Sequence, residues 1–193
     1  MKKAEPFWTI PNLLSLYRLL SFPLGLFLIL EEQRWWFVLF LSFNLFTDIL
    51  DGYIARKFNQ MTAIGARLDS WADAGTYVLA FIGIFVFERQ FLLDHVFGLS
   101  LFASLYVLSF VFTLLKFGRL CGLHLYSFKI TGYLQGSFIL VLFWFGNIEW
   151  FYLLMISVGC MACLEQLIII YLLPQPESDV KGLYWVWQQK RTS

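Results

Sequence analysis

Four aspartates lie in one short stretch of the sequence, where they form two pairs. Asp48 and Asp51 are three residues apart, and Asp69 and Asp73 are four residues apart. At either spacing, two helical residues share one face. Carboxylates crowded into a partly dehydrated site repel one another unless a cation neutralises them. Oxygen-only ligands suit hard ions such as Mg²⁺, Mn²⁺ or Ca²⁺, and four carboxylates are enough for two ions that share ligands.

Three neighbouring residues extend this chemistry toward phosphate. Gly52 follows the first aspartate pair directly, and Gly65 precedes the second pair by four residues. A bulky ligand could approach the backbone at either glycine, although helix packing explains each of them equally well. Arg56 follows on the same side, and a guanidinium binds pyrophosphate through paired hydrogen bonds. We therefore interpret this stretch as a phosphoryl-transfer site.

The composition places the stretch in a membrane. Of the 193 residues, 60% are hydrophobic and 14% are charged, and the mean hydropathy is +0.70. A soluble core of this size could not bury that much apolar surface. Six runs are long enough to cross a bilayer as helices, namely residues 11–30, 35–55, 68–87, 91–115, 130–145 and 150–173. We predict an all-α integral membrane protein with six transmembrane helices in one bundle.

Charge placement predicts the orientation of this bundle. Residues 1–175 would form one transmembrane domain, and residues 176–193 a cytoplasmic C-terminal tail. With a cytoplasmic N-terminus, all basic residues except Arg34 and Arg89 fall on the cytoplasmic side, Arg18 being counted among them. Both termini and the aspartates would then face the cytoplasm, which indicates a multi-pass protein of the inner membrane. The net charge of +1 gives no indication of a nucleic-acid partner.

The two aspartate pairs should meet at the cytoplasmic surface. About nine residues, 56–64, separate the second and third predicted spans, so these helices should be antiparallel and lie side by side. A single aspartate pair near a membrane surface is commonly a solvated helix end. Two pairs brought together are better explained by function, because ionisable residues within spans are costly.

The stretch resembles the signature of the CDP-alcohol phosphotransferase family, D-x-x-D-G-x-x-A-R-x8-G-x3-D-x3-D. The matching residues are Asp48, Asp51, Gly52, Ala55, Arg56, Gly65, Asp69 and Asp73. The run from Pro11 to Leu14, together with Arg18, is similar to the N-terminal segment of the family. The six predicted spans also agree with this resemblance.

The resemblance implies an activity and roles for these residues. The four aspartates would hold two divalent cations, Mg²⁺ or Mn²⁺, and Asp73 would also act as the general base. A phosphatidyl group would pass from CDP-diacylglycerol to a small alcohol, with release of CMP. The CDP-lipid would be bound by Asn12, Gly52, Ala55, Arg56 and Gly65. The resemblance further suggests a homodimer.

The acceptor alcohol stays open at this stage. The basic residues Arg119, His124 and Lys129, with Lys116 nearby, could bind an anionic acceptor such as glycerol 3-phosphate or inositol phosphate, although ordinary positive-inside charge explains them equally well. Lys129 and Gln135 resemble a pattern in members that accept glycerol phosphate. Those members usually have proline and lysine where this chain has Ser70 and Ala74, and that segment is more similar to the serine-accepting branch.

A cation transporter or channel is the alternative from another class, because intramembrane aspartates also bind permeating cations. Such a protein usually places its carboxylates near the bilayer midplane, in interrupted and duplicated helices. Here they are expected at the cytoplasmic ends of two helices, without a second copy and close to Arg56. Elsewhere, Glu165 is expected to pair with a polar group across helices, and the aromatic tail around Trp185 to anchor at the interface.

Overall fold

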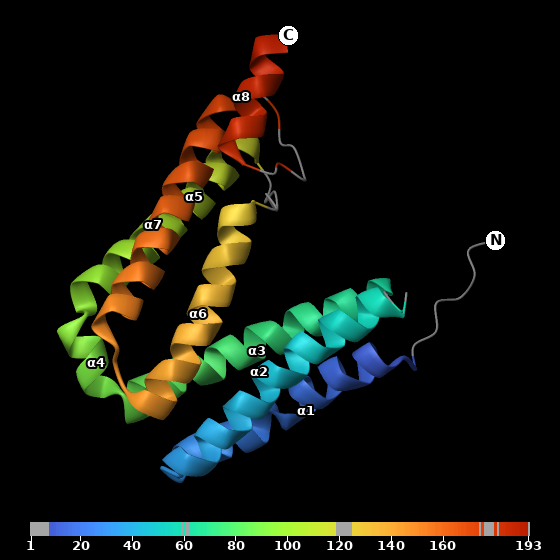
Figure 1. The fold of residues 1–193 in the computed structure, drawn as a ribbon, viewed down its shortest axis with the longest axis vertical. Coiled ribbons are helices and arrows are strands. Elements are labelled where there is room, and N and C mark those ends of the chain that lie inside the picture. The colour runs from blue at the N-terminus through green and yellow to red at the C-terminus, as the bar shows by residue number, and fades with distance from the viewer. Residues whose placement is uncertain are drawn as a thin grey trace. The chain divides into compact units, whose positions relative to one another are not determined.

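The computed structural model contains all 193 residues and describes residues 8–58, 60, 62–118, 125–173, 175, 180 and 182–192. These residues form helices joined by short connections (Figure 1). The helices are α1 (Ile10–Leu30), α2 (Arg34–Lys57), α3 (Ala63–Phe87), α4 (Arg89–Asp94), α5 (Val96–Phe117), α6 (Tyr126–Phe145), α7 (Glu149–Leu172) and α8 (Leu183–Thr192). Six of them, α1, α2, α3, α5, α6 and α7, are long and apolar enough to cross a membrane. The predicted all-α architecture with six spans is confirmed.

The third span begins earlier than predicted. Residue 68 was expected to open it, but α3 already begins at Ala63. Thr62 has an extended backbone, and its hydroxyl accepts a hydrogen bond from the Gly65 N–H at 2.9 Å. This contact satisfies a backbone donor that has no partner within the helix, and so stabilises the helix start.

The fourth predicted span, residues 91–115, is wrong as a single helix. His95 leaves the helical conformation, with φ −115° and ψ 15°, and it separates short α4 from α5. One ring nitrogen of His95 lies 2.9 Å from the Phe91 carbonyl oxygen, and the other lies 2.9 Å from a Glu149 carboxylate oxygen. The Glu149 contact joins residues distant in sequence, and the apolar pattern of the sequence does not reveal it.

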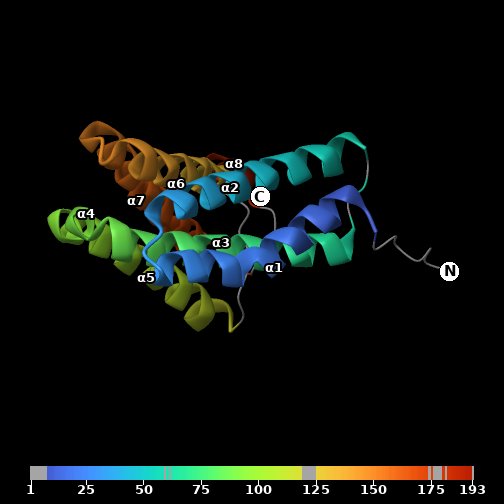
Figure 2. The same ribbon diagram turned by 90° about the horizontal axis from the view of Figure 1, so that it is seen from below.

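The residues up to Gln90 form one compact unit, in which α1 packs along both α2 and α3 (Figures 1 and 2). The helices α2 and α3 contact each other much less than each contacts α1, whereas the sequence predicted that they pack directly. Gly25 lets α1 approach both neighbours. A methyl group there would come within 2.6 Å of Phe40 on α2 and 2.7 Å of Leu79 on α3.

The residues from Phe91 onward form a second compact unit, in which α5 and α6 both pack on α7. The short helix α8 packs on α7 through an apolar cluster formed by Leu125, Ile169, Leu173, Val180 and Val186. Glu165 on α7 accepts a hydrogen bond from the Leu183 N–H at 2.9 Å. This carboxylate thus binds a backbone donor in the first turn of α8 that has no partner within the helix. Glu165 was expected to pair with a polar group of another helix, and that group is a backbone N–H.

Gly25 provides a test of this packing. We expect Gly25→Ala to lower the free energy of unfolding by about 1–3 kcal/mol, because the added methyl group forces Phe40 and Leu79 to move. The measurement is thermal unfolding in detergent, followed by intrinsic fluorescence. Gly132→Ala on α6 is the matched control, because a methyl group there meets no described atom within 4 Å. Equal losses in the two variants would contradict the close approach of α1.

Candidate functional site

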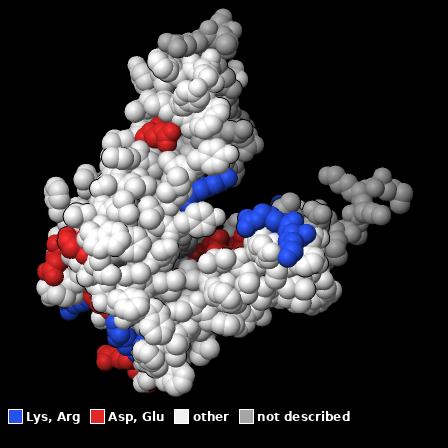
Figure 3. Space-filling view, in the orientation of Figure 1, with Lys and Arg blue, Asp and Glu red and all other residues white. Residues whose placement is uncertain are grey.

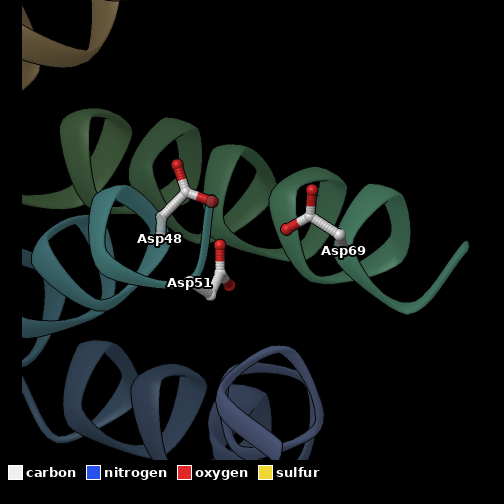
Figure 4. Close-up of side chains that lie close together, drawn as sticks. All are labelled: Asp48, Asp51 and Asp69. Carbon is white, nitrogen blue, oxygen red and sulfur yellow. The ribbon is translucent and has the colours of Figure 1, made fainter. Parts of the chain in front are cut away.

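The two aspartate pairs converge within the first unit. Asp48 and Asp51 project from α2, and Asp69 projects from α3 toward them (Figure 4). One carboxylate oxygen from each of these three residues lies within 4.8 Å of the others. Such a set of oxygen atoms matches the ligands that hard divalent cations prefer. The expected convergence of the aspartates is therefore present in the structure, although α2 and α3 themselves pack mainly on α1.

Arg18 of α1 lies at the centre of this cluster and contacts every aspartate in it. Its Nη1 donates to Asp48 at 2.5 Å and to Asp73 at 2.7 Å. Its Nη2 donates to Asp51 at 2.7 Å and to Asp69 at 2.6 Å. Asp73, the fourth member, thereby joins the group through the same guanidinium. The Arg18 side chain is only 1% exposed.

Sequence reasoning missed the role of Arg18. It treated this residue as part of the N-terminal resemblance and as a basic residue on the cytoplasmic side. The structure instead buries Arg18 within α1, so it does not belong in a count of loop charges. A signal was available, because a guanidinium in the interior of an apolar run must find partners. That signal does not identify the partners, which the structure shows to be aspartates of α2 and α3.

The cluster retains capacity for metal. Its four carboxylates and one guanidinium carry a formal charge of −3 if all are ionised. Each carboxylate uses one oxygen for Arg18 and has a second oxygen. Asp48, Asp69 and Asp73 keep side-chain exposures of 37%, 43% and 41%. On the face seen in Figure 3, acidic side chains of this unit are visible close to a group of basic ones. The residues therefore fit hard divalent cations in both donor type and charge.

A cavity of about 250 Å³ adjoins the cluster within the same unit. Its walls come from the N-terminal parts of α1 and α3 and from the C-terminal part of α2. The lining residues are Pro11, Asn12, Ser15, Asp51, Gly52, Ala55, Arg56, Gln60, Thr62, Gly65, Ala66 and Asp69. All five residues that were predicted to bind the CDP-lipid, namely Asn12, Gly52, Ala55, Arg56 and Gly65, are among them. Two of the aspartates, Asp51 and Asp69, belong to both the cavity and the cluster.

Two capped helix ends meet at this cavity. The Thr9 hydroxyl accepts a hydrogen bond from the Asn12 N–H at 3.4 Å at the start of α1, and Thr62 caps α3 in the same way. The Thr62 hydroxyl also donates to the Asn12 side-chain oxygen at 3.3 Å. Helix N-termini carry partial positive charge and free backbone N–H groups, both of which favour anions. The cavity is thus suited to an anionic ligand.

The two glycines of the signature have different surroundings. A methyl group at Gly65 would overlap the Asn12 side-chain oxygen and lie 2.8 Å from the Thr62 hydroxyl. A methyl group at Gly52 would meet only the Arg56 guanidinium, at an ordinary contact distance of 3.7 Å. Close packing therefore requires Gly65, whereas Gly52 is a bare part of the cavity wall. The sequence left both alternatives open for each glycine.

Gln60 is a further cavity residue that sequence reasoning did not select. Its side-chain oxygen is buried and has no hydrogen-bond partner among the described residues. A buried acceptor without a partner costs free energy, so a ligand donor at this position would be favoured. Nothing in the residue type or the spacing singled out Gln60, because its burial depends on how α2 and α3 are connected.

Of the three predicted acceptor residues, the structure describes Lys129 alone. Arg119 and His124 fall outside the described residues. Lys129 is exposed on α6, with its ammonium nitrogen 5.4 Å from the centre of the Tyr126 ring. Lys116 donates hydrogen bonds of 2.9 Å to the carbonyl oxygens of Ile170 and Tyr171 near the end of α7. A structural contact therefore accounts for Lys116, and the acceptor role of the other three stays a prediction.

Comparison with known proteins agrees with this geometry. The profile of the CDP-alcohol phosphatidyltransferase family matches residues 8–164, so the chain belongs to that family. It is 38% identical over 92 residues to a CDP-diacylglycerol–glycerol-3-phosphate 3-phosphatidyltransferase of Aquifex aeolicus, a match covering 48% of this chain and 52% of that protein. It is 41% identical over 78 residues to a CMP-forming cardiolipin synthase of Streptomyces coelicolor, covering 37% of this chain and 36% of that protein.

The matched part of the chain thus spans about half the length of the first relative and about a third of the second. A further CDP-diacylglycerol–glycerol-3-phosphate 3-phosphatidyltransferase, from Cereibacter sphaeroides, is 38% identical over 79 residues, which are 39% of this chain and 36% of that protein. The comparison with solved structures finds no match.

The contrast between the two glycines can be tested directly. We expect Gly65→Ala to lower the free energy of unfolding by about 1–3 kcal/mol, because Asn12 and Thr62 must move apart. Gly52→Ala should leave stability unchanged or raise it by up to about 1 kcal/mol, because alanine favours the helix. Thermal unfolding of the two variants and the parent protein measures both effects. A larger loss in Gly52→Ala than in Gly65→Ala would contradict the described packing.

Proposed function

We propose that the protein is a CDP-alcohol phosphatidyltransferase that moves a phosphatidyl group from CDP-diacylglycerol to a small alcohol and releases CMP. The observation that carries this proposal is the shared boundary between the cavity and the aspartate cluster. Asp51 and Asp69 line the cavity and also bind Arg18 within the cluster. A ligand in the cavity therefore reaches the carboxylates without crossing another part of the protein. Family membership over residues 8–164 supports the same reaction class.

In this proposal, Asp48, Asp51, Asp69 and Asp73 hold two divalent cations, Mg²⁺ or Mn²⁺. When bound, these ions would offset the negative charge of the pyrophosphate and of the developing transition state. The hard oxygen ligands of the cluster and its net negative charge support this assignment. The exposed fractions of Asp48, Asp69 and Asp73 leave them accessible from outside the protein.

The cavity would bind the cytidine-diphosphate part of the donor. The N-termini of α1 and α3 and the Arg56 guanidinium supply positive charge for the pyrophosphate. Gly52 leaves room for that group beside Arg56. The unpartnered oxygen of Gln60 is an acceptor for a donor such as the exocyclic amine of cytosine. A volume of about 250 Å³ suits a nucleotide portion better than a whole lipid, whose chains would extend into the bilayer.

Asp73 would act as general base. One of its carboxylate oxygens is bound to Arg18 at 2.7 Å, which orients the group, and the carboxylate would take the proton from the acceptor hydroxyl. That hydroxyl oxygen forms a bond to the phosphorus of the phosphatidyl group. The bond from the same phosphorus to the CMP oxygen breaks, and CMP leaves with the electron pair.

The acceptor alcohol belongs to one of a few classes. The relatives are named for phosphatidyl transfer to glycerol 3-phosphate and for cardiolipin synthesis, which favours an acceptor that bears a phosphate. Ser70 and Ala74 follow the aspartates of α3, and the sequence resemblance at these positions favours serine instead. Inositol phosphate remains a third candidate of the phosphate-bearing type.

Orientation and assembly complete the proposal. Most basic residues fall on the predicted cytoplasmic side, and only Arg34 and Arg89 fall on the other side. This distribution supports cytoplasmic termini and a cytoplasmic active site in the inner membrane. Of the fourteen basic residues, Arg18 is buried and is left out; eleven of the others fall on the cytoplasmic side and two on the opposite side. The family resemblance supports a homodimer. The alternative of a cation transporter or channel has less support, because the carboxylates lie toward one end of α2 and α3 and adjoin a cavity that Arg56 lines, which suits an anionic ligand.

The proposed reaction is tested by CMP release. We expect purified protein to release CMP from CDP-diacylglycerol when Mg²⁺ or Mn²⁺ and a suitable alcohol are present, and chelation to stop this release. Asp73→Asn should reduce the rate by about 10²–10⁴-fold, with less effect on donor binding, because it removes the general base. Glu31→Gln, an exposed position after α1, is the control. Unchanged turnover after chelation or in Asp73→Asn would contradict the proposal, as would cation flux into vesicles without CMP release.

The acceptor is identified by comparing alcohols under the same assay. We expect CMP release with glycerol 3-phosphate or phosphatidylglycerol to exceed that with serine or inositol phosphate, as the names of the relatives suggest. Analysis of the lipid product by mass spectrometry shows which headgroup was joined. A serine-containing product alone would instead support the resemblance at Ser70 and Ala74, and would contradict the expected preference for phosphate.

A further inference from the structure

Arg18 is a buried charge whose presence requires an explanation beyond the four carboxylates themselves. The whole residue is 3% exposed, and α1 is one of the helices that are apolar enough to span the membrane. Burial of a guanidinium costs several kcal/mol unless its hydrogen bonds and its charge are matched. Among the described residues, Arg18 is the one basic side chain that forms ion pairs with the cluster.

The arrangement of its ion pairs is informative. Each terminal nitrogen of Arg18 bridges one aspartate of α2 and one of α3: Nη1 joins Asp48 to Asp73, and Nη2 joins Asp51 to Asp69. The helices α2 and α3 otherwise make few contacts with each other. The guanidinium therefore connects two helices whose acidic faces would repel one another across the site.

We propose that Arg18 is a positioning residue that serves as a resident counter-ion for the four aspartates. It holds the carboxylates of α2 and α3 together before a metal binds, and it lowers the charge that bound cations must neutralise. The part of this inference that concerns metal rests on the proposed function. The part that concerns the metal-free protein rests only on the observed contacts.

Lysine could not replace Arg18 in this role. A guanidinium has two terminal nitrogens with two N–H groups each, and all four aspartates take part in bonds to these nitrogens. An ammonium has three N–H groups on one nitrogen. The Ser15 hydroxyl gives Asp51 a second donor at 3.3 Å, but it carries no charge. A planar, forked cation is thus the side chain that the four-way contact demands.

A charge-balance experiment tests the counter-ion in metal-free protein. We expect Arg18→Met to lower the Tm in the presence of chelator by on the order of 10 °C, because four buried or half-buried carboxylates lose their counter-charge. Adding Asp51→Asn, which removes one negative charge at the most buried aspartate, should recover a substantial part of this loss. If Arg18 serves only to fill space, the two substitutions will lower the Tm additively, and that result overturns the proposal.

The metal arm separates this inference from the proposed function. Added Mn²⁺ should raise the Tm of Arg18→Met more than it raises the Tm of the parent protein, because bound cations replace the missing charge. The rise in Tm that Mn²⁺ causes in Arg18→Lys should lie between those of Arg18→Met and the parent protein. Arg34→Met is the matched control, because Arg34 forms an exposed ion pair with Glu88 at 2.7 Å, and its response to Mn²⁺ should equal that of the parent.

Each outcome of these measurements has a distinct meaning. An equal Mn²⁺ shift in Arg18→Met and in the parent would overturn the claim that Arg18 and bound cations neutralise the same charges. Absence of any Mn²⁺ shift in all variants would count against the proposed metal site. In that case the charge-balance result in metal-free protein still decides whether Arg18 is a counter-ion.

Discussion

The contact between one guanidinium and four carboxylates is the interaction on which the rest of the first unit depends. Aspartates on two membrane-spanning helices are tolerated only where their charge is matched, and Arg18 matches part of it from a third helix. Because the site is made by α1, α2 and α3 together, α1 has to lie against both of the other helices. In the C-terminal half of α1, Gly25 permits this approach, because it has no side chain between the helix and Phe40 and Leu79. Packing and electrostatics thus impose the same arrangement.

Local sequence patterns predict much of this organisation. Apolar run length identifies the six spans, because each helix must satisfy its backbone within the membrane, and the spacing of Asp48, Asp51, Asp69 and Asp73 places each pair on one helix face. The role of Arg18 and the break at His95 depend on partners distant in sequence. Arg18 meets residues at least thirty positions away, and His95 contacts Glu149. A single sequence shows that such residues need partners, but not which partners they find.

The cavity shows the same division between local and tertiary information. The five residues Asn12, Gly52, Ala55, Arg56 and Gly65 line one cavity, and their binding of a CDP-lipid stays a prediction. The different roles of the two glycines depend on how the helix ends meet. Gly65 makes room for Asn12 and Thr62, whereas Gly52 leaves the cavity wall open beside Arg56. Gln60, without any motif of its own, becomes a cavity residue through the connection between α2 and α3.

The position of Arg18 in the first helix also bears on how the chain is assembled during synthesis. The ribosome makes the guanidinium before any of the four aspartates, since α1 precedes α2 and α3. When α2 and then α3 leave the translocation machinery, an opposite charge is already present in the membrane to receive each acidic pair. With this order each acidic pair enters a membrane in which its counter-charge is already present, and in exchange the Arg18 guanidinium is unmatched until α2 arrives.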